Sequence, residues 1–345
     1  MAKAARLSII AKLEKARDSR LVTYVTSTRQ YLEVSMAMDA IRRIYDHVSH
    51  WTSPGKKIPQ IDLFLHSNGG DGIVPWRLVT LLREHATKLC VLVPFRAFSA
   101  ATLTALGADE IVMHPMAMLG PTDPTVANEF NPQDPTNPSR RLGISVEDVT
   151  AYIALIREDA AIQHEEEVIQ AFGKLADKIH PLALGNVKRS LSQSRMMAKK
   201  LLSLHMDPTK EEHRIDEIVD SFTSKLFFHG HPINRNEARE QLELATVQFP
   251  PPAVEKAMWQ LYLDYEKEMQ FEHPFVPVSE FLTAFPDLKV GEQKTTPATR
   301  AKLAFIESNT RTDVFSLEYE LSGAKAPDGS TNVSLINRHE GWTTE

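Results

Sequence analysis

Short apolar segments alternate with amphipathic helical segments over residues 21–114, and this alternation constrains the fold more than any other feature of the chain. Four of the segments have the length and the apolar, β-branched character of buried strands. They read LVTYVTS from Leu21, IDLFLH from Ile61, KLCVLVP from Lys88 and EIVMH from Glu110. Apolar residues at helical spacing fill the intervals between them. Three successive strand–helix–strand units require parallel pairing with right-handed crossovers. We therefore predict an α/β fold with a mostly parallel sheet.

A proline-rich stretch ends this alternation. Residues 115–138 contain six prolines, and this density predicts a long loop without regular structure. Helical patterns dominate from Val146 onward, and a further helix is predicted at 253–270, after a run of three prolines. We expect a main domain over residues 1–250. Residues 251–345 are expected to form a helical or irregular appendage that is a candidate oligomerisation segment.

Composition excludes several classes of protein. The net charge of −6 gives no reason to expect nucleic acid or an anionic membrane as a partner. Cys90 is the single cysteine, which excludes an internal disulfide framework and a cysteine-based zinc site. The 13 histidines show no spacing typical of a metal site. No segment has the roughly 18 apolar residues that span a bilayer, and residues 1–20 form an amphipathic pattern rather than a secretory signal. We expect a cytoplasmic protein without a membrane partner, a metal or a cofactor.

Two segments contain the parts of an acyl-transfer site. The strand at Ile61 ends in HSNGG, which places Gly69 and Gly70 at the carboxyl edge of a parallel sheet, where open α/β sheets carry their sites. Without a Cβ atom, the backbone there can approach a ligand closely. Ser99 begins the helix in FSAAT, and the amide of Ala100 is a candidate donor to an oxyanion. Each part also has a simpler interpretation: Ser99 as a helix N-cap, and the glycine pair as a tight turn or a phosphate cradle.

Taken together, the order and spacing of these segments resemble the Clp protease–crotonase superfamily. HSNGG is similar to the Ser-Pro-Gly-Gly-like turn of Clp-type peptidases and signal peptide peptidase A, with Asn68 in place of proline. FSAATLTALGADEIVMHPMAMLG is similar to the nucleophile helix and the two strands that follow it. The signatures SxxATxxALGADEIVM and LGPxDP most closely resemble the serine dehydrogenase proteinase family. The resemblance covers roughly residues 15–250. It implies the ββα-unit spiral of that superfamily, with a mostly parallel sheet, to which helical additions and the C-terminal appendage are attached.

The resemblance also implies roles for individual residues. Ser99 corresponds to the nucleophile, and the backbone amides of Gly69, Gly70 and Ala100 correspond to the oxyanion hole. Proteins of this superfamily assemble into rings or stacked trimers, so the resemblance implies a homo-oligomer. The expected substrate is a peptide or a protein.

The general base does not follow from the resemblance. The histidine of Clp peptidases matches the region Pro121–Asp123, which contains no histidine, and the lysine of signal peptide peptidases matches a position near Leu155, where no lysine is present. We expect His114 to be structural and His66 to orient backbone next to the glycine turn. Asp123 is a candidate for orienting a base or for capping its loop.

The remaining candidates for the base lie in the segment DKIHPLALGNVKRS. We favour Lys178 and His180, and Lys174 and Lys188 flank them. A lysine acts as a base when burial lowers its pKa. Each of these side chains also fits a structural or solvent-exposed position on a helix.

Three hypotheses for the function remain. The first is a serine endopeptidase-like hydrolase of the Clp and signal peptide peptidase A type, acting through an acyl-enzyme. A crotonase-like acyl-CoA hydratase or hydrolase would use paired acids, and the sequence around Gly69 lacks a glutamate pair. A non-catalytic scaffold or pseudoenzyme on the same fold is the third. The apolar stripe of the helix at 253–270 fits either a contact between subunits or packing against its own domain.

Overall fold

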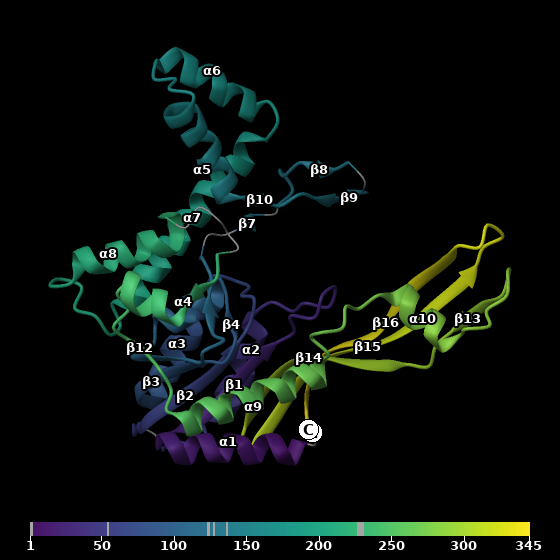
Figure 1. Ribbon diagram of the computed structural model, residues 1–345, viewed down its shortest axis with the longest axis horizontal. Coiled ribbons are helices and arrows are strands. Elements are labelled where there is room, and N and C mark those ends of the chain that lie inside the picture. Colours follow the sequence, from purple (N-terminus) through teal and green to yellow (C-terminus); the bar gives the residue numbers. More distant parts are fainter. Residues whose placement is uncertain (1–2, 54, 123–124, 127, 136, 226–230) are drawn as a thin grey trace.

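The computed structural model describes residues 3–53, 55–122, 125–126, 128–135, 137–225 and 231–345, and one large sheet forms its centre (Figure 1). Among these residues, five parallel strands make up one half of the sheet, in the order β12, β5, β3, β2, β1. They are β1 (Arg20–Thr26), β2 (Ile58–His66), β3 (Ala86–Val93), β5 (Glu110–Met113) and β12 (Val247–Gln248). The four strands predicted from the sequence, and their parallel pairing, are confirmed.

Helices cover both faces of the parallel half (Figure 1). One face packs against α2 (Met38–Val48), α3 (Val74–His85), α4 (Ala100–Leu106) and α7 (Pro181–Leu202), and the other against α1 (Lys3–Arg17) and α9 (Pro252–Met269). Alternate residues of β1 show the division: Val22 and Tyr24 belong to the first core, Leu21 and Val25 to the second. Because both faces are buried, these strands are continuous apolar runs rather than alternating ones.

The helix predicted at 253–270 is α9, and its apolar stripe packs against its own chain. Met258, Leu261, Tyr262 and Tyr265 are buried in the core that α9 shares with α1. These four side chains have no surface left for a partner, so the interpretation of the stripe as a contact between subunits is wrong for them.

The remainder of segment 251–345 differs from its prediction. The sequence predicts a helical or irregular appendage, but four strands follow α10 (Pro277–Ala284). They are β13 (Gln293–Thr295), β14 (Thr299–Ser308), β15 (Arg311–Lys325) and β16 (Thr331–Thr344). β14 pairs antiparallel with β1, with Val25 opposite Phe305, so these strands continue the main sheet. The prediction is wrong. β16 carries no buried apolar face and is held by its long backbone ladder to β15, whereas β14 and β15 do bury apolar residues that the sequence analysis did not recognise as strands.

Between β5 and β12 the chain leaves the main sheet. The stretch predicted to lack regular structure contains three short strands, β6 (Met118–Leu119), β7 (Thr125–Val126) and β8 (Gln133–Asp134), so that prediction is wrong in part. The elements after it are β9 (Asn137–Arg141), β10 (Ile144–Ser145), α5 (Val146–Ala154), a π-helical turn (Leu155–Asp159), α6 (Glu165–Ala176), α8 (Glu212–Asp220), two further π-helical turns (Ser221–Lys225 and Glu237–Gln241) and β11 (Ile233–Asn234).

Residues 146–180, which we call the arm, extend away from the sheet at the top of Figure 1. Pro181 begins α7, as its position in the sequence predicts, and α7 leads from the arm back to the sheet. In the part of the chain that the structure describes, no helix is both long and apolar enough to cross a bilayer.

Candidate active site

The glycine turn after β2 touches the residues around Ser99. A Cβ atom added to Gly69 would lie 2.6 Å from the carbonyl oxygen of Phe98, 2.8 Å from Cβ of Ser99 and 3.0 Å from the amide nitrogen of Ala100. The φ angle of Gly69 is +100°, a left-handed conformation that side chains rarely adopt. Glycine is therefore required at this position on two counts. The two segments predicted to form one site do lie against each other.

Gly70 is fixed against a different neighbour. A Cβ atom there would lie 2.3 Å from the carbonyl oxygen of Met36. The amide of Met36 donates to the carbonyl oxygen of Gly69 at 2.7 Å, and the amide of Asp71 donates to the carbonyl oxygen of Met36 at 3.0 Å. The segment before α2 thus also holds the glycine turn, through a contact that no sequence motif signals.

Ser99 occupies a strained backbone conformation directly before α4. Its φ and ψ angles are 51° and −114°, and a non-glycine residue held in a sparsely populated region costs on the order of 1–3 kcal/mol. Its side chain makes no capping hydrogen bond, so the simpler interpretation as an N-cap lacks its defining interaction. The residue is partly exposed, which leaves its hydroxyl within reach of a ligand.

Buried packing around α4 holds Ser99 in place. Every residue of α4 is buried. The hydroxyl of Thr102 donates to the carbonyl oxygens of Ala97 at 2.6 Å and Gly120 at 2.8 Å, which ties the helix to β4 (Arg96–Ala97) and to the residue after β6. Because α4 is fixed by packing and by these hydrogen bonds, Ser99 at its start is held in one conformation.

Among the described residues, the backbone amides of Gly70, in the glycine turn, and of Ala100, which follows Ser99 in the chain, have no acceptor. The amide of Gly69 is already engaged, because it donates to Oγ of Ser67 at 3.0 Å. Ser67 in turn accepts a hydrogen bond from the hydroxyl of Thr26 at 2.8 Å. Sequence reasoning missed Ser67, although it stands inside HSNGG, where a short hydroxyl side chain is suited to bonding backbone two residues on.

His66 and His114 each hold backbone through Nδ1. His66 is fully buried, its Nδ1 accepts the amide N–H of Arg96 at 3.2 Å, and its ring stacks on Phe95. Burial lowers the pKa of His66 to about 3, so the ring stays neutral. His114 accepts the amide N–H of Met116 at 3.1 Å and stacks on Trp259 at 4.9 Å. Burial also lowers the pKa of His114.

Lys178 and His180 lie at the end of the arm and are exposed. Nδ1 of His180 accepts the amide N–H of Leu182 at 3.2 Å and thereby caps α7. The later turns of α7 share a core with α4, to which Met197 and Leu201 belong. From Met197 back to the start of α7 the helix rises by about 24 Å. Within one chain, the structure therefore does not bring Lys178 or His180 to Ser99.

The other candidates for a base give no contact with Ser99 either. Lys174 and Lys188 are exposed, and Asp123 lies outside the described residues. Across the ranges that the structure describes, no histidine, lysine, aspartate or glutamate side chain forms a hydrogen bond with Ser99.

Parts of the chain are similar to known proteins. A family model described as ClpP-like SDH-type serine proteinase matches residues 1–198. The uncharacterized proteins MJ1495 and MJ0137 of Methanocaldococcus jannaschii are 29% and 26% identical over 211 and 193 residues, which cover 60% and 55% of this chain. These matches span 63% and 66% of the relatives' own length.

Among solved structures, two variants of a membrane-bound stomatin-specific protease are similar to this chain at TM-scores of 0.33 and 0.34, and one of them is in complex with a substrate peptide. Each is 14% identical and matches 61% of this chain, and the matches cover 70% and 67% of their own length.

Proposed function

Because the chain belongs to the family of ClpP-like SDH-type serine proteinases, we propose that it hydrolyses peptide bonds through an acyl-enzyme on Ser99. One observation carries this proposal: Gly69 of the glycine turn lies against a strained, partly exposed Ser99, and the amides of Gly70 in that turn and of Ala100 are unengaged. Acyl transfer requires a nucleophile and free N–H donors for the oxyanion.

In the proposed reaction, Oγ of Ser99 attacks the carbonyl carbon of a peptide bond and its proton passes to a base. The resulting oxyanion accepts hydrogen bonds from the amides of Ala100 and Gly70. Gly69, which has no side chain, allows the turn to lie close enough to Ser99 for the amide of Gly70 to donate. The base returns the proton to the leaving amine, and water then hydrolyses the ester. Loss of one such donor raises a barrier of this kind by about 2.7–4 kcal/mol.

We further propose that the base is Lys178 or His180 of a second copy of the chain. Support comes from the arm, which carries both residues away from the sheet of its own chain (Figure 1). In this arrangement the active site is complete only in a homo-oligomer, because the site of one chain receives its base from the arm of another.

Intact-mass detection of a fluorophosphonate adduct tests the nucleophile. We expect one adduct on the purified protein, none on Ser99→Ala, and one on Ser203→Ala, a matched control in which another partly exposed serine is removed. An unlabelled wild-type protein would contradict the proposal and favour a binding role for this fold.

Mixing two inactive variants tests the base. Lys178→Met or His180→Gln is expected to label slowly alone and to regain labelling when Ser99→Ala chains are added, because those chains still supply the arm. Labelling of both variants at the wild-type rate would remove these residues from the mechanism.

A further inference from the structure

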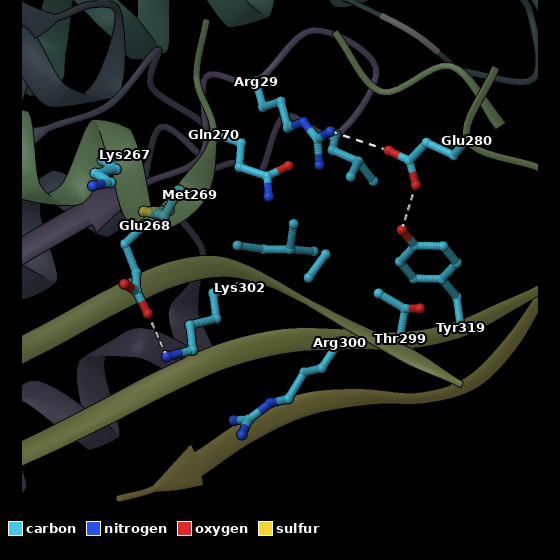
Figure 2. Close-up of a pocket in the computed structure, with 13 residues that line it drawn as sticks. Arg29, Lys267, Glu268, Met269, Gln270, Glu280, Thr299, Arg300, Lys302 and Tyr319 are labelled. Atoms are coloured by element: carbon cyan, nitrogen blue, oxygen red, sulfur yellow. Dashed lines mark hydrogen bonds and ion pairs between the residues drawn. The ribbon is translucent and has the colours of Figure 1, made fainter. Parts of the chain in front are cut away.

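A pocket of about 470 Å³ lies on the antiparallel side of the molecule, apart from Ser99 and the glycine turn (Figure 2). Its walls come from four places: the loop after β1, the end of α9, α10, and strands β14 and β15. Ligand pockets in proteins have volumes of about 300–1,000 Å³. The space is therefore large enough for a small organic molecule.

Positive charge exceeds negative charge in this pocket. Arg29, Lys267, Arg300 and Lys302 line it, together with the carboxylates of Glu268 and Glu280. Both carboxylates are already neutralised. Glu268 accepts from Lys302 at 2.6 Å, and Glu280 accepts from Arg29 at 3.2 Å and from the hydroxyl of Tyr319 at 2.8 Å. The lining as a whole carries two positive charges in excess.

Lys267 is the cation with a free charge. Its side chain is exposed, and in the described part of the chain it forms neither a hydrogen bond nor an ion pair. Arg300, by contrast, donates to Ser316 at 2.9 Å and pairs with Glu345 at 3.0 Å. Figure 2 shows Lys267 on the same side of the pocket as Glu268 and Lys302.

Arg29 supplies a rigidly held hydrogen-bond donor on the other side of the pocket. Only 8% of its side chain is exposed. Nε donates to the carbonyl oxygen of His273 at 2.7 Å, one Nη donates to Glu280, and the guanidinium lies 5.4 Å from the ring of Phe275. Its other Nη group has no hydrogen-bond acceptor among the described residues. A guanidinium locked in this way loses little entropy when it binds an oxyanion.

Gln270 adds a neutral donor between the two cations. It ends α9 in a left-handed conformation with a φ angle of 57°, and its side chain lines the cavity together with Arg29 (Figure 2). Leu32, Met269 and Leu303 provide apolar wall nearby.

We propose that this pocket binds a small organic anion. A phosphate or carboxylate group of the ligand is held by Arg29, Lys267 and Gln270, and its apolar part packs against Leu32 and Leu303. The proposal is independent of the reaction at Ser99.

Calorimetric titration of the full-length Ser99→Ala protein tests the proposal, with inorganic phosphate, pyrophosphate and citrate as probes and sodium chloride at equal ionic strength as the reference. We expect saturable binding of at least one probe above the reference. Binding of the phosphates alone identifies a phosphate site, and binding of citrate alone identifies a carboxylate site.

Two lysine variants on α9 provide the matched control. Lys267→Glu is expected to weaken binding at least tenfold, whereas Lys256→Glu, on the same helix and outside the pocket, leaves it unchanged. Gln270→Gly, which suits the left-handed backbone, is expected to weaken it about threefold through the loss of one hydrogen bond. Equal losses in both lysine variants, or no saturable binding of any probe, would overturn the proposal.

Discussion

β1 separates two halves of one sheet that stabilise the molecule in different ways. On one side β1 pairs parallel with β2, and on the other it pairs antiparallel with β14. The parallel half buries apolar side chains on both faces, with a buried carboxylate, Asp62 of β2, paired with Arg17 of α1, and the glycine turn meets Ser99 at its carboxyl edge. The antiparallel half buries charged side chains inside itself. The first half is thus a support for a site, and the second holds several elements of the chain together.

Two buried clusters illustrate the second half. Glu307 of β14 accepts from Nε of Arg6 at 2.8 Å and from the hydroxyl of Tyr265 at 2.6 Å, so one carboxylate joins β14 to both α1 and α9. His47 of α2 contacts Asp313 at 3.1 Å through Nε2 and Ser308 at 2.8 Å through Nδ1. The second cluster has the residue types of a catalytic triad, but all three are fully buried or nearly so, and a substrate cannot reach Ser308.

The largest effect, a loss in the free energy of unfolding, is expected from Arg6→Ala. Removal of this side chain leaves Glu307 and Asp264 as buried carboxylates without the guanidinium, and breaking a buried ion pair costs about 3–5 kcal/mol. Chemical denaturation measures the free energy of unfolding, with Lys12→Ala on the exposed face of α1 as the control. If the antiparallel half serves stability, the variant that remains folded labels at Ser99 at the wild-type rate. A slower rate would mean that the two halves are coupled.

Gly69→Ala tests the other half. The added Cβ would meet the carbonyl oxygen of Phe98 at 2.6 Å, so the turn must shift away from Ser99 and the amide of Gly70 with it. We expect labelling at least a hundredfold slower, in line with the loss of one oxyanion donor. Gly72→Ala is the matched control, since a Cβ there meets nothing within 4 Å. Similar rates in the two variants would argue against a role for the turn.

The pH dependence of stability distinguishes two of the buried histidines, His66 and His47. Burial lowers the pKa of His66 to about 3 and that of His47 to about 4, against an ordinary value of 6.5. A lowered pKa means that the folded state prefers the neutral ring, so this contribution is complete above pH 6.5 and is lost as the pH falls towards 4. For His66 the loss is about 3 kcal/mol at pH 4. It is smaller for His47, because Asp313 favours the charged ring.

Free energies of unfolding measured between pH 7 and pH 4 test this order. His66→Gln is expected to reduce the slope of the unfolding free energy against pH more than His47→Gln does. The reverse order would show that the carboxylate of Asp313 does not offset the effect of burial on His47.

The difference between the two halves of the sheet also explains which strands can be predicted from the sequence and which cannot. The strand at Ile61 and its neighbours are recognisable because burial on both faces leaves uninterrupted apolar runs. The contact between HSNGG and Ser99 follows from their places at neighbouring strand ends. β16 could not be recognised, because TNVSLINRHEGWTT is largely exposed and its pairing with β15 depends on backbone. The base stays a prediction, because the positions of Lys178 and His180 relative to Ser99 depend on long-range packing that local patterns do not encode.

The smallest effect on stability is expected from a substitution at the surface, where the two halves of the sheet meet. Nε1 of Trp342 on β16 donates to the carboxylate of Asp39, in the first turn of α2, at 2.8 Å. A hydrogen bond of this kind to a charged group at an exposed position contributes roughly 1 kcal/mol, so Trp342→Phe, which keeps an aromatic ring against Phe315, is expected to lower the free energy of unfolding by about that amount. Labelling of Ser99 should not change, because Met36, just before α2, contacts the glycine turn through its backbone and not through Asp39. A loss several times larger in denaturation would mean that β16 stabilises the parallel half directly and that the sheet behaves as one unit.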